Sequence, residues 1–387
     1  MTDQSYDLAA LRAREFPWSG DTIWLDHASI GPLPERTRQA VDRFNARRAR
    51  PFELEADDQF GTLARARQAV ARLINAAPEE VALSPNTTFG IALAAQALPL
   101  EPGDVVLVSH REFPANVYPW LLLRRRGVVT ELVPVDRAGW PDEERLLDRL
   151  SDPRVRVLAV SLTQFASGYT VDLARLSAAC RRLGKWLVVD AIQAAGQLPI
   201  DVRAVPVDIL AAGGQKWLLS PWGSGFVYVR RDLVPRLEPT VTGWMAFEGT
   251  DDFTRLTDYR DTLRPDARRF ELITLPYQDF AGMLASLELL LELGVPAIRR
   301  HLEALHAPVL AWAERRGIAV TSPRGERGSA ILCLAPERGR ELVRRLRERR
   351  IYCSFREGAI RLSPHCYNTV EEMARVAEEL DRLLGRS

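Results

Sequence analysis

The feature that most constrains the fold of this chain is a series of short, nearly continuous apolar runs that alternate with helical segments. A run without polar alternation is typical of a strand that helices cover on both faces. Between two runs, residues 172–184 place leucines on one stripe and arginines elsewhere and end at a glycine, which predicts an amphipathic helix. Residues 155–193 therefore form a β-α-β unit of a mainly parallel α/β sheet. The runs are VVLVS (105–109), VRVLAVSL (155–162), WLVVDAIQ (186–193), DILAAGG (208–214) and GFVYVR (225–230).

The character of the sequence changes beyond about residue 262, where a leucine-rich helix (280–293) precedes Arg-rich helices and short strands. A length of 387 residues suits two domains at the usual size of about 100 to 200 residues each. We expect an N-terminal arm at residues 1–20, a large α/β domain at residues 21–262 and a smaller α+β domain at residues 263–387.

The charge balance argues against nucleic acid or an anionic membrane as a partner, because 52 Lys and Arg residues balance 51 Asp and Glu residues. A small neutral or zwitterionic partner fits better. The N-terminus has no apolar signal-peptide core, and no stretch of ~18 apolar residues occurs. The four scattered cysteines form no CxxC pair, so we expect a reducing cytoplasm and no metal site.

Lysine is almost absent from the basic residues: Lys185 and Lys216 are the only two, and 50 of the 52 are arginines. Arginine remains charged, with a pKa above ~12, and cannot form a Schiff base. Lys216 follows an apolar strand among glycines, aromatics and leucines, which favours a function over the alternative of a solvated loop lysine. Lys185, beside Gly184 at a helix end, is typical of a capping charge.

Asp190 ends one apolar strand, and Lys216 lies just past another. Such strand ends line the ligand crevice of open α/β sheets. Pyridoxal phosphate needs both groups: the lysine binds it as a Schiff base, and the aspartate keeps the pyridine nitrogen protonated. Gln193 is placed to donate to the phenolate oxygen of the ring. A helix cap at the strand end is the alternative role for Asp190.

A phosphate group needs its own binding site, and Asn86, Thr87 and Thr88 precede a helix of small residues. Backbone N–H groups and hydroxyls at a helix N-terminus converge on an anion. A plain helix N-cap is the alternative role for these residues.

From WLDHAS (24–29) to SPHCYNT (363–369), the chain resembles the class V, fold-type I family of pyridoxal-phosphate enzymes. This group contains aminotransferases, cysteine desulfurases, kynureninase and isopenicillin N epimerase-like proteins, the last being the closest in pattern. The resemblance implies a seven-stranded, mainly parallel sheet in the large domain. The motifs in order are the Thr-Thr turn, EFPAN, Asp-x-x-Gln, Gly-x-Lys-Trp, RRFELIT and Arg-x-Ser.

The resemblance also implies roles for single residues toward the cofactor. Thr87 and Thr88 hold the phosphate, Phe113 stacks on the pyridine face, and Asn116 lies near the ring substituents. Thr274 reaches the phosphate bound to the other subunit, which implies a homodimer with sites at the interface. Gln215 stands where many members have a histidine, so the site lacks an imidazole at this cofactor-binding position.

On the substrate side, the resemblance implies that Arg361 holds the α-carboxylate with its planar guanidinium. Gln164 lies near the same carboxylate. Ala28 and Ser29, in the WLDHAS motif, are also assigned to substrate binding.

The cysteines depart from the desulfurase pattern, in which a nucleophilic cysteine sits on a mobile loop before the arginine. Residues 351–361 are too short for such a loop, Cys353 falls in a predicted strand, and Cys366 follows the arginine. Both are expected to be buried, small apolar residues, which disfavours persulfide chemistry.

These observations predict a homodimeric pyridoxal-phosphate enzyme that acts at the α-carbon of an amino acid, with Lys216 as Schiff-base lysine and proton shuttle. Aminotransferase or epimerase-like chemistry leads, and a cysteine desulfurase or C–S lyase is the alternative. A third alternative is a catalytically inert binding protein of the same fold. The retention of Lys216, Asp190 and Arg361 together argues against this last reading.

Overall fold

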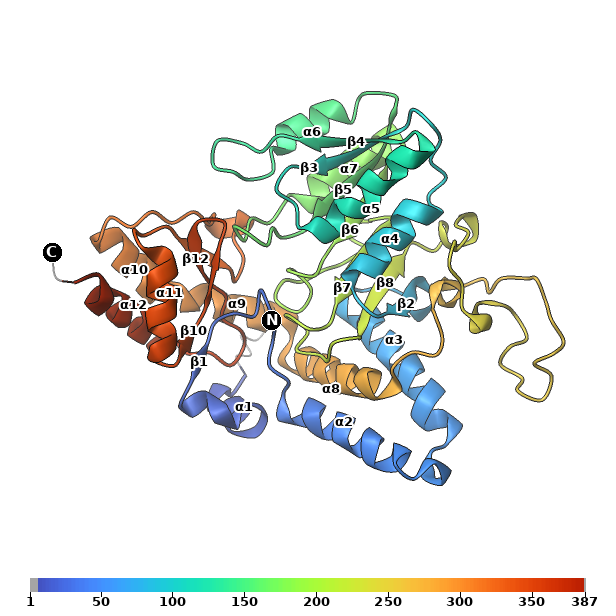
Figure 1. Ribbon diagram of the computed structural model, residues 1–387, viewed down its shortest axis with the longest axis horizontal. Helices are drawn as coiled ribbons and strands as arrows, with labels where there is room; N and C mark the ends of the chain where they lie inside the picture. Colours follow the sequence, from blue (N-terminus) through green and yellow to red (C-terminus); the bar gives the residue numbers. More distant parts are fainter. Residues whose placement is uncertain (1–5, 386–387) are drawn as a thin grey trace.

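The computed structural model describes residues 6–385, and its centre is a seven-stranded sheet in the order β2-β8-β7-β6-β5-β3-β4 (Figure 1). Neighbouring strands are parallel except at β8, which runs antiparallel to β7 and β2. The expected mainly parallel sheet is therefore confirmed. Its strands are β2 (Val81–Ser84), β3 (Val105–Ser109), β4 (Val129–Val133), β5 (Val155–Ser161), β6 (Trp186–Asp190), β7 (Ile209–Gly213) and β8 (Gly225–Val229).

Both faces of the sheet are covered, as the continuous apolar runs predict. On β3, Leu107 packs into one buried apolar cluster and its neighbours Val106 and Val108 pack into another. Helix α7 (Leu173–Leu183) contributes to the first cluster, and α4 (Thr87–Ala97) contributes to the second. The other helices of this part are α2 (Glu35–Arg48), α3 (Thr62–Leu73), α5 (Tyr118–Leu122) and α6 (Glu143–Arg149).

The C-terminal part contains a three-stranded antiparallel sheet in the order β11-β12-β9, drawn in orange and red in Figure 1. Its strands are β9 (Leu332–Leu334), β11 (Ser354–Arg356) and β12 (Ala359–Leu362). Its helices are α9 (Val295–Leu305), α10 (Ala307–Arg315), α11 (Gly339–Glu348) and α12 (Val370–Leu384).

Two sets of contacts cross the domain boundary expected at residue 262. Strand β1 (Ile23–Trp24) pairs in parallel with β10 (Ile351–Tyr352) in the C-terminal part. Helix α8 (Tyr277–Leu293) packs against α2 and α3 of the large part. Within the expected arm, residues 1–5 lie outside the described residues, and α1 spans Leu8–Glu15.

Among residues 6–385, no single helix is long and apolar enough to cross a membrane. Only the pair Tyr277–Leu293 and Val295–Arg315 has the necessary length and composition, and that pair is bent by 76°.

Candidate active site

A cavity of about 340 Å³ lies where the carboxyl ends of β6 and β7 face the β11–β12 hairpin. Its size is at the lower end of the range for small-molecule sites, ~300 to 1,000 Å³. It brings together most of the residues assigned from the sequence. The lining residues are Ala28, Ser29, Asn86, Thr87, Thr88, Phe113, Ala115, Phe165, Asp190, Ile192, Gln193, Gln215, Lys216, Arg356 and Arg361.

Lys216 is the amine of this cavity. The residue is 8% exposed, and its Nζ lies 5.5 Å from the centre of the Phe113 ring. Within the part of the chain that the structure describes, this Nζ makes no hydrogen bond or ion pair. Burial lowers the pKa of Lys216, the attraction of Asp190 opposes that shift, and Arg361 adds to it. A buried amine without a partner suits covalent capture of an aldehyde.

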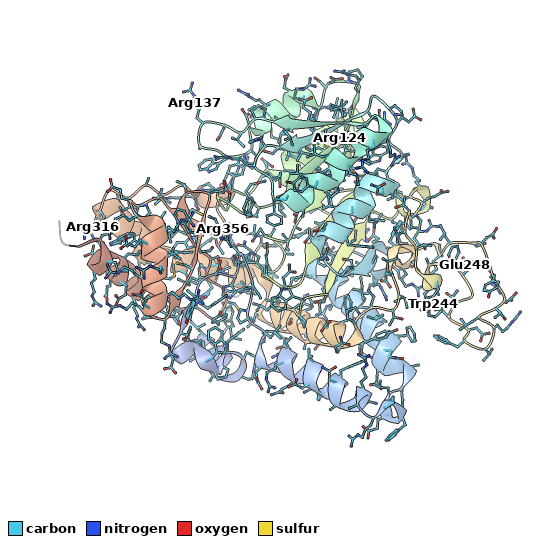
Figure 2. All side chains as sticks on the ribbon, in the orientation of Figure 1. Arg124, Arg137, Trp244, Glu248, Arg316 and Arg356 are labelled. Carbon is cyan, nitrogen blue, oxygen red and sulfur yellow. The ribbon has the colours of Figure 1, made fainter. Side chains whose placement is uncertain are left out.

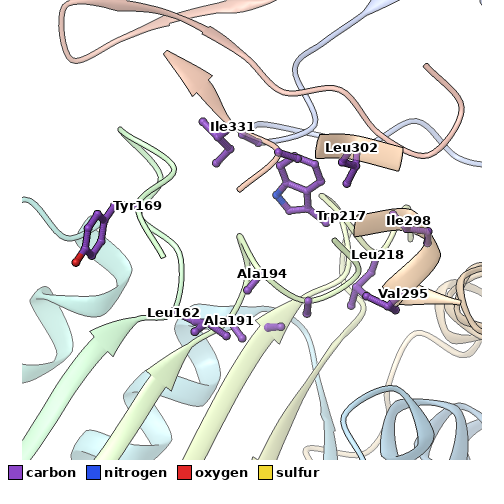
Figure 3. Close-up of a cluster of buried hydrophobic side chains, with 14 of the residues drawn as sticks. Leu162, Tyr169, Ala191, Ala194, Trp217, Leu218, Val295, Ile298, Leu302 and Ile331 are labelled. Atoms are coloured by element: carbon purple, nitrogen blue, oxygen red, sulfur yellow. The ribbon is translucent and has the colours of Figure 1, made fainter. Parts of the chain in front are cut away.

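The loop that carries Lys216 is fixed by contacts on several sides. The Trp217 indole N–H donates to Gln193 Oε1 at 2.8 Å, and the Trp217 carbonyl accepts from His365 Nε2 at 2.8 Å. Figure 3 shows the buried Trp217 ring between the strand ends and the C-terminal part, close to Leu302. The backbone at Gly31 approaches the Lys216 carbonyl so closely that a Cβ there would lie 2.2 Å from the oxygen.

Asp190 is the buried carboxylate at the end of β6. Its Oδ1 accepts the N–H of Ile192 at 2.9 Å within a turn, and no helix begins there, so the alternative role as a helix cap is wrong. Burial raises the pKa of Asp190, the nearby Glu112 adds to the rise, and Lys216 opposes it. A pyridinium N–H in the cavity would provide the positive partner that this carboxylate needs. Gln193 donates from Nε2 to the Ala28 carbonyl at 2.9 Å.

The N-terminus of α4 opens into the same cavity. Asn86 caps the helix by accepting the N–H of Phe89 at 2.9 Å, and Thr87 Oγ1 accepts the N–H of Gly213 at 2.9 Å. Thr88 is exposed at the cavity wall. Asn86 is therefore the N-cap that the alternative reading proposed. The backbone N–H groups of the first turn nevertheless remain available to a phosphate.

Arg361 projects from β12 and is held rigidly. Its Nη2 donates to Ser29 Oγ at 2.6 Å and to Asp26 Oδ1 at 3.3 Å. Its Nη1 donates to the Phe165 carbonyl at 2.8 Å, and its Nε to Ser354 Oγ at 3.2 Å. Burial lowers the pKa of Arg361, although Asp26 opposes that shift. A carboxylate that binds here meets a guanidinium whose position is already fixed.

Three of the assigned residues do not line the cavity. Gln164 donates from Nε2 to Glu112 Oε1 at 2.8 Å, beneath the wall. Asn116 is fully buried at the end of the EFPAN segment, which Glu112 begins. Thr274 is exposed on the segment before α8. Its expected role needs a second subunit. Conversely, Phe165 and Arg356 line the cavity but were not assigned from the sequence. Their closeness in the sequence to Gln164 and Arg361, which were assigned, could have indicated them.

None of the four cysteines is among the residues that line this cavity. Cys366 is buried as expected, whereas the expectation of a buried residue is wrong for Cys353, which is half-buried between β10 and β11. Burial raises the pKa of Cys353 to about 12 and that of Cys333 to about 11. Burial also raises the pKa of the Cys366 thiol, and it raises that of Cys180 to about 12. Thiols with raised pKa values are poor nucleophiles at neutral pH.

A parallel α/β sheet whose strand ends bring a lysine, a carboxylate and a helix N-terminus to one cavity defines a pyridoxal-phosphate enzyme of fold type I. The chain belongs to the aminotransferase class-V family, whose model matches residues 23–376. It is a pyridoxal-phosphate-dependent enzyme.

Relatives with different activities match most of the chain. It is 31% identical to an uncharacterized aminotransferase, YcbU, from Bacillus subtilis over 315 residues, 81% of this chain and 82% of the relative. It is 32% identical to isopenicillin N epimerase from Streptomyces clavuligerus over 384 residues, 93% of this chain and 94% of the relative. The crystal structure of the cysteine desulfurase CsdA from Escherichia coli superposes with a TM-score of 0.85 at 25% identity, covering 98% of this chain and 99% of that one.

Proposed function

We propose that this enzyme is an aminotransferase that moves the α-proton of an amino acid with one base, Lys216. The observation that carries the proposal is the composition of the cavity wall. Lys216 is its one amine, and the lining residues within the described chain include no histidine, cysteine, tyrosine or glutamate. When bound, pyridoxal phosphate supplies an electron sink that makes the α-proton of the substrate acidic.

Each residue of the wall has a defined task in this proposal. Thr87, Thr88 and the N-terminus of α4 hold the phosphate, and Asp190 holds the proton on the pyridine nitrogen. Arg361 binds the α-carboxylate and so orients the α-C–H bond. Lys216, released from the cofactor when the substrate takes its place, would accept the α-proton and deliver it on the same side to the cofactor carbon that receives the amino group, so that the substrate leaves as a keto acid. Its lowered pKa leaves more of the neutral amine available at neutral pH.

Epimerisation is the second candidate, and the isopenicillin N epimerase relative favours it. Inversion requires that a proton return to the opposite face of the α-carbon. Phe113, whose ring faces Lys216, carries no exchangeable proton. Transamination needs no second base, so the wall fits it better.

Persulfide chemistry is disfavoured because it requires an exposed, mobile thiolate. Strands β11 and β12 are joined by only two residues, Glu357 and Gly358, which leaves no long loop at this edge of the cavity. Replacing all four cysteines with alanine should therefore leave turnover within a few-fold of the unsubstituted enzyme. Labelled sulfur on any cysteine after incubation with cystine or cysteine would contradict this assignment.

One single-turnover experiment separates the reactions. The cofactor-loaded enzyme is mixed with a panel of L-amino acids in deuterated water without an amino acceptor. We expect one equivalent of keto acid per site and a change in cofactor absorbance. The inverted amino acid with deuterium at its α-carbon indicates an epimerase instead, and sulfide or alanine from cysteine indicates a desulfurase or lyase.

The proposed enzyme is a homodimer in which Thr274 approaches the phosphate of the other subunit. Supporting this, the segment before α8 protrudes from the body of the molecule (Figure 2, near Trp244) and exposes large apolar side chains. Sedimentation of the unsubstituted protein should show a dimer. Phe253→Asp should weaken this dimer, whereas the control Val370→Asp, on α12, should leave it intact. A monomeric unsubstituted protein would refute the proposed homodimer. The exposed side chains are Val241, Trp244, Phe253, Leu256 and Tyr259.

A further inference from the structure

Arg356 is a cation of the cavity wall that the proposed function does not use. Arg356 is exposed, and its Nη1 donates to the carbonyl of the preceding residue, Phe355, at 3.2 Å. Within residues 6–385, no carboxylate forms an ion pair with it. In Figure 2 its label lies on the side of the C-terminal part that faces the large sheet.

The register of the β11–β12 hairpin explains why Arg356 points the same way as Arg361. Ser354 pairs with Arg361, and Arg356 pairs with Ala359. Directly opposed residues of an antiparallel pair share a face, and so do residues two apart on one strand. Arg356 and Arg361 are therefore diagonal neighbours on the cavity face, about 7–8 Å apart at the backbone.

The opposite face of the hairpin is covered by α11. There the guanidinium of Arg340 lies over the Phe355 ring at 5.1 Å, and a Cβ on Gly339 would meet the same ring. The tight turn that fixes this arrangement has two central residues, Glu357 with φ 46° and Gly358 with φ 86°. Positive φ at both positions defines the type I′ turn, which matches the twist of a hairpin. Arg356 is thus placed at the cavity by rigid backbone.

The charges of the wall leave Arg356 without a partner. The lining cations are Lys216, Arg356 and Arg361, and the lining anion is Asp190. In the proposed function, Lys216 and Asp190 serve the cofactor, and Arg361 serves the α-carboxylate. One positive charge of the wall, that of Arg356, then remains without an assigned partner.

We propose that Arg356 binds an anionic group on the substrate side chain, so that the substrate is an amino acid with a second carboxylate. This inference rests on the proposed function, because it takes Arg361 as the site of the first carboxylate. Two arginines one diagonal apart match two carboxylates joined by a short chain, as in aspartate or glutamate. A planar guanidinium facing such a group forms charge-assisted hydrogen bonds.

The test compares acids with their uncharged amides of nearly equal size. Cofactor-loaded enzyme is mixed with glutamate, glutamine, aspartate or asparagine, and the rate of cofactor absorbance change gives kcat/KM. Binding without turnover is measured by tryptophan fluorescence with glutarate and with its monoamide, which cannot react. The variants are Arg356→Gln and Arg356→Lys, with Arg340→Gln as control because it removes the same charge from the opposite face of the hairpin.

We expect the unsubstituted enzyme to prefer the acid to the amide by ~10- to 100-fold, the usual contribution of a charged hydrogen bond. Arg356→Gln should reduce that ratio to about 1 in both rate and binding, Arg356→Lys should keep part of it, and Arg340→Gln should keep all of it.

Three results overturn the inference. The first is an unsubstituted enzyme that does not prefer the acid. The second is an Arg356→Gln enzyme whose rates and affinities for acid and amide are both unchanged. The third is an equal loss for acid and amide in that variant, which would make Arg356 a site for the first carboxylate or a structural residue. Failure of the proposed function is distinct: the single-turnover experiment would then give an inverted amino acid, or sulfide or alanine from cysteine, in place of a keto acid.

Discussion

Gly31→Ala tests whether the backbone around Lys216 must be held where the structure has it. A Cβ at position 31 would lie 2.2 Å from the Lys216 carbonyl oxygen and 2.8 Å from Leu219 Cδ2. Real Cβ atoms essentially never come closer than 3.0 Å to such a neighbour, so the lysine loop must move by at least about 0.8 Å. Gly31 does not have a positive φ, so the effect is steric rather than conformational.

The expected cost has two parts. Overpacking of a well-filled site destabilises a protein by about 1–3 kcal/mol, which should lower the thermal midpoint by a few degrees. A displacement of about 1 Å at a catalytic group can cost about 100-fold in rate. Gly31→Ala should therefore fold, bind cofactor with an altered absorbance band and react at least ~10-fold more slowly with amino acids.

The control is Gly20→Ala, because a Cβ at Gly20 meets nothing within 4 Å. Its midpoint and rate should stay within experimental error of the unsubstituted enzyme, since surface substitutions usually change stability by less than about 0.5 kcal/mol. The assays are differential scanning fluorimetry, the absorbance spectrum of the bound cofactor and single-turnover kinetics. A Gly31→Ala enzyme with unchanged midpoint, spectrum and rate would show that the lysine loop tolerates displacement.

Four further outcomes follow from the site. Lys216→Ala should fold and bind cofactor noncovalently without turnover; borohydride labelling elsewhere in that protein would contradict the assignment. Asp190→Asn should keep the cofactor but lose several orders of magnitude in rate, whereas a near-normal rate would remove its role at the pyridine nitrogen. Arg361→Lys should raise KM, because a point charge replaces a planar group, and an unchanged KM would place the carboxylate elsewhere. Burial lowers the pKa of His306 and His365 from 6.5 to about 4, so unfolding should become easier as the pH falls from about 6.5 toward 4; His306→Gln should flatten that dependence, measured as thermal midpoint against pH.

The sequence predicted the elements whose signal is local. Helix α7 begins after Asp172, whose side chain accepts the N–H of Arg175, and ends at Gly184 with φ 64°, as the polar cap and glycine indicate. Strand β4 was not predicted because most of its residues are exposed or half-buried at the edge of the sheet, where no apolar run is required. The pairing of β1 with β10 joins residues more than 300 positions apart and has no local signal.

The site was predicted as far as strand ends and helix termini determine it. Asp190, Lys216 and the Asn86–Thr88 turn converge because the carboxyl ends of parallel strands meet at one edge. The direction in which a loop side chain points depends on its tertiary contacts, so the sequence did not predict it. Gln164 turns beneath the wall because the buried Glu112 carboxylate also accepts the N–H of Ser161 and needs further donors.

The hairpin register links two properties of the site that the sequence treats separately. Joining β11 to β12 through two residues keeps this edge of the cavity short and rigid, so no cysteine between Ile351 and Arg361 can swing toward a substrate. The same register sets Arg356 diagonally beside Arg361 on the cavity face. If one or two residues were inserted at Gly358, Arg356 would lose its fixed position while Cys353 stayed half-buried between β10 and β11. Such an insertion should therefore abolish discrimination between acid and amide without creating desulfurase activity. A longer turn would make this edge of the cavity more mobile, but it would not provide a reactive thiolate.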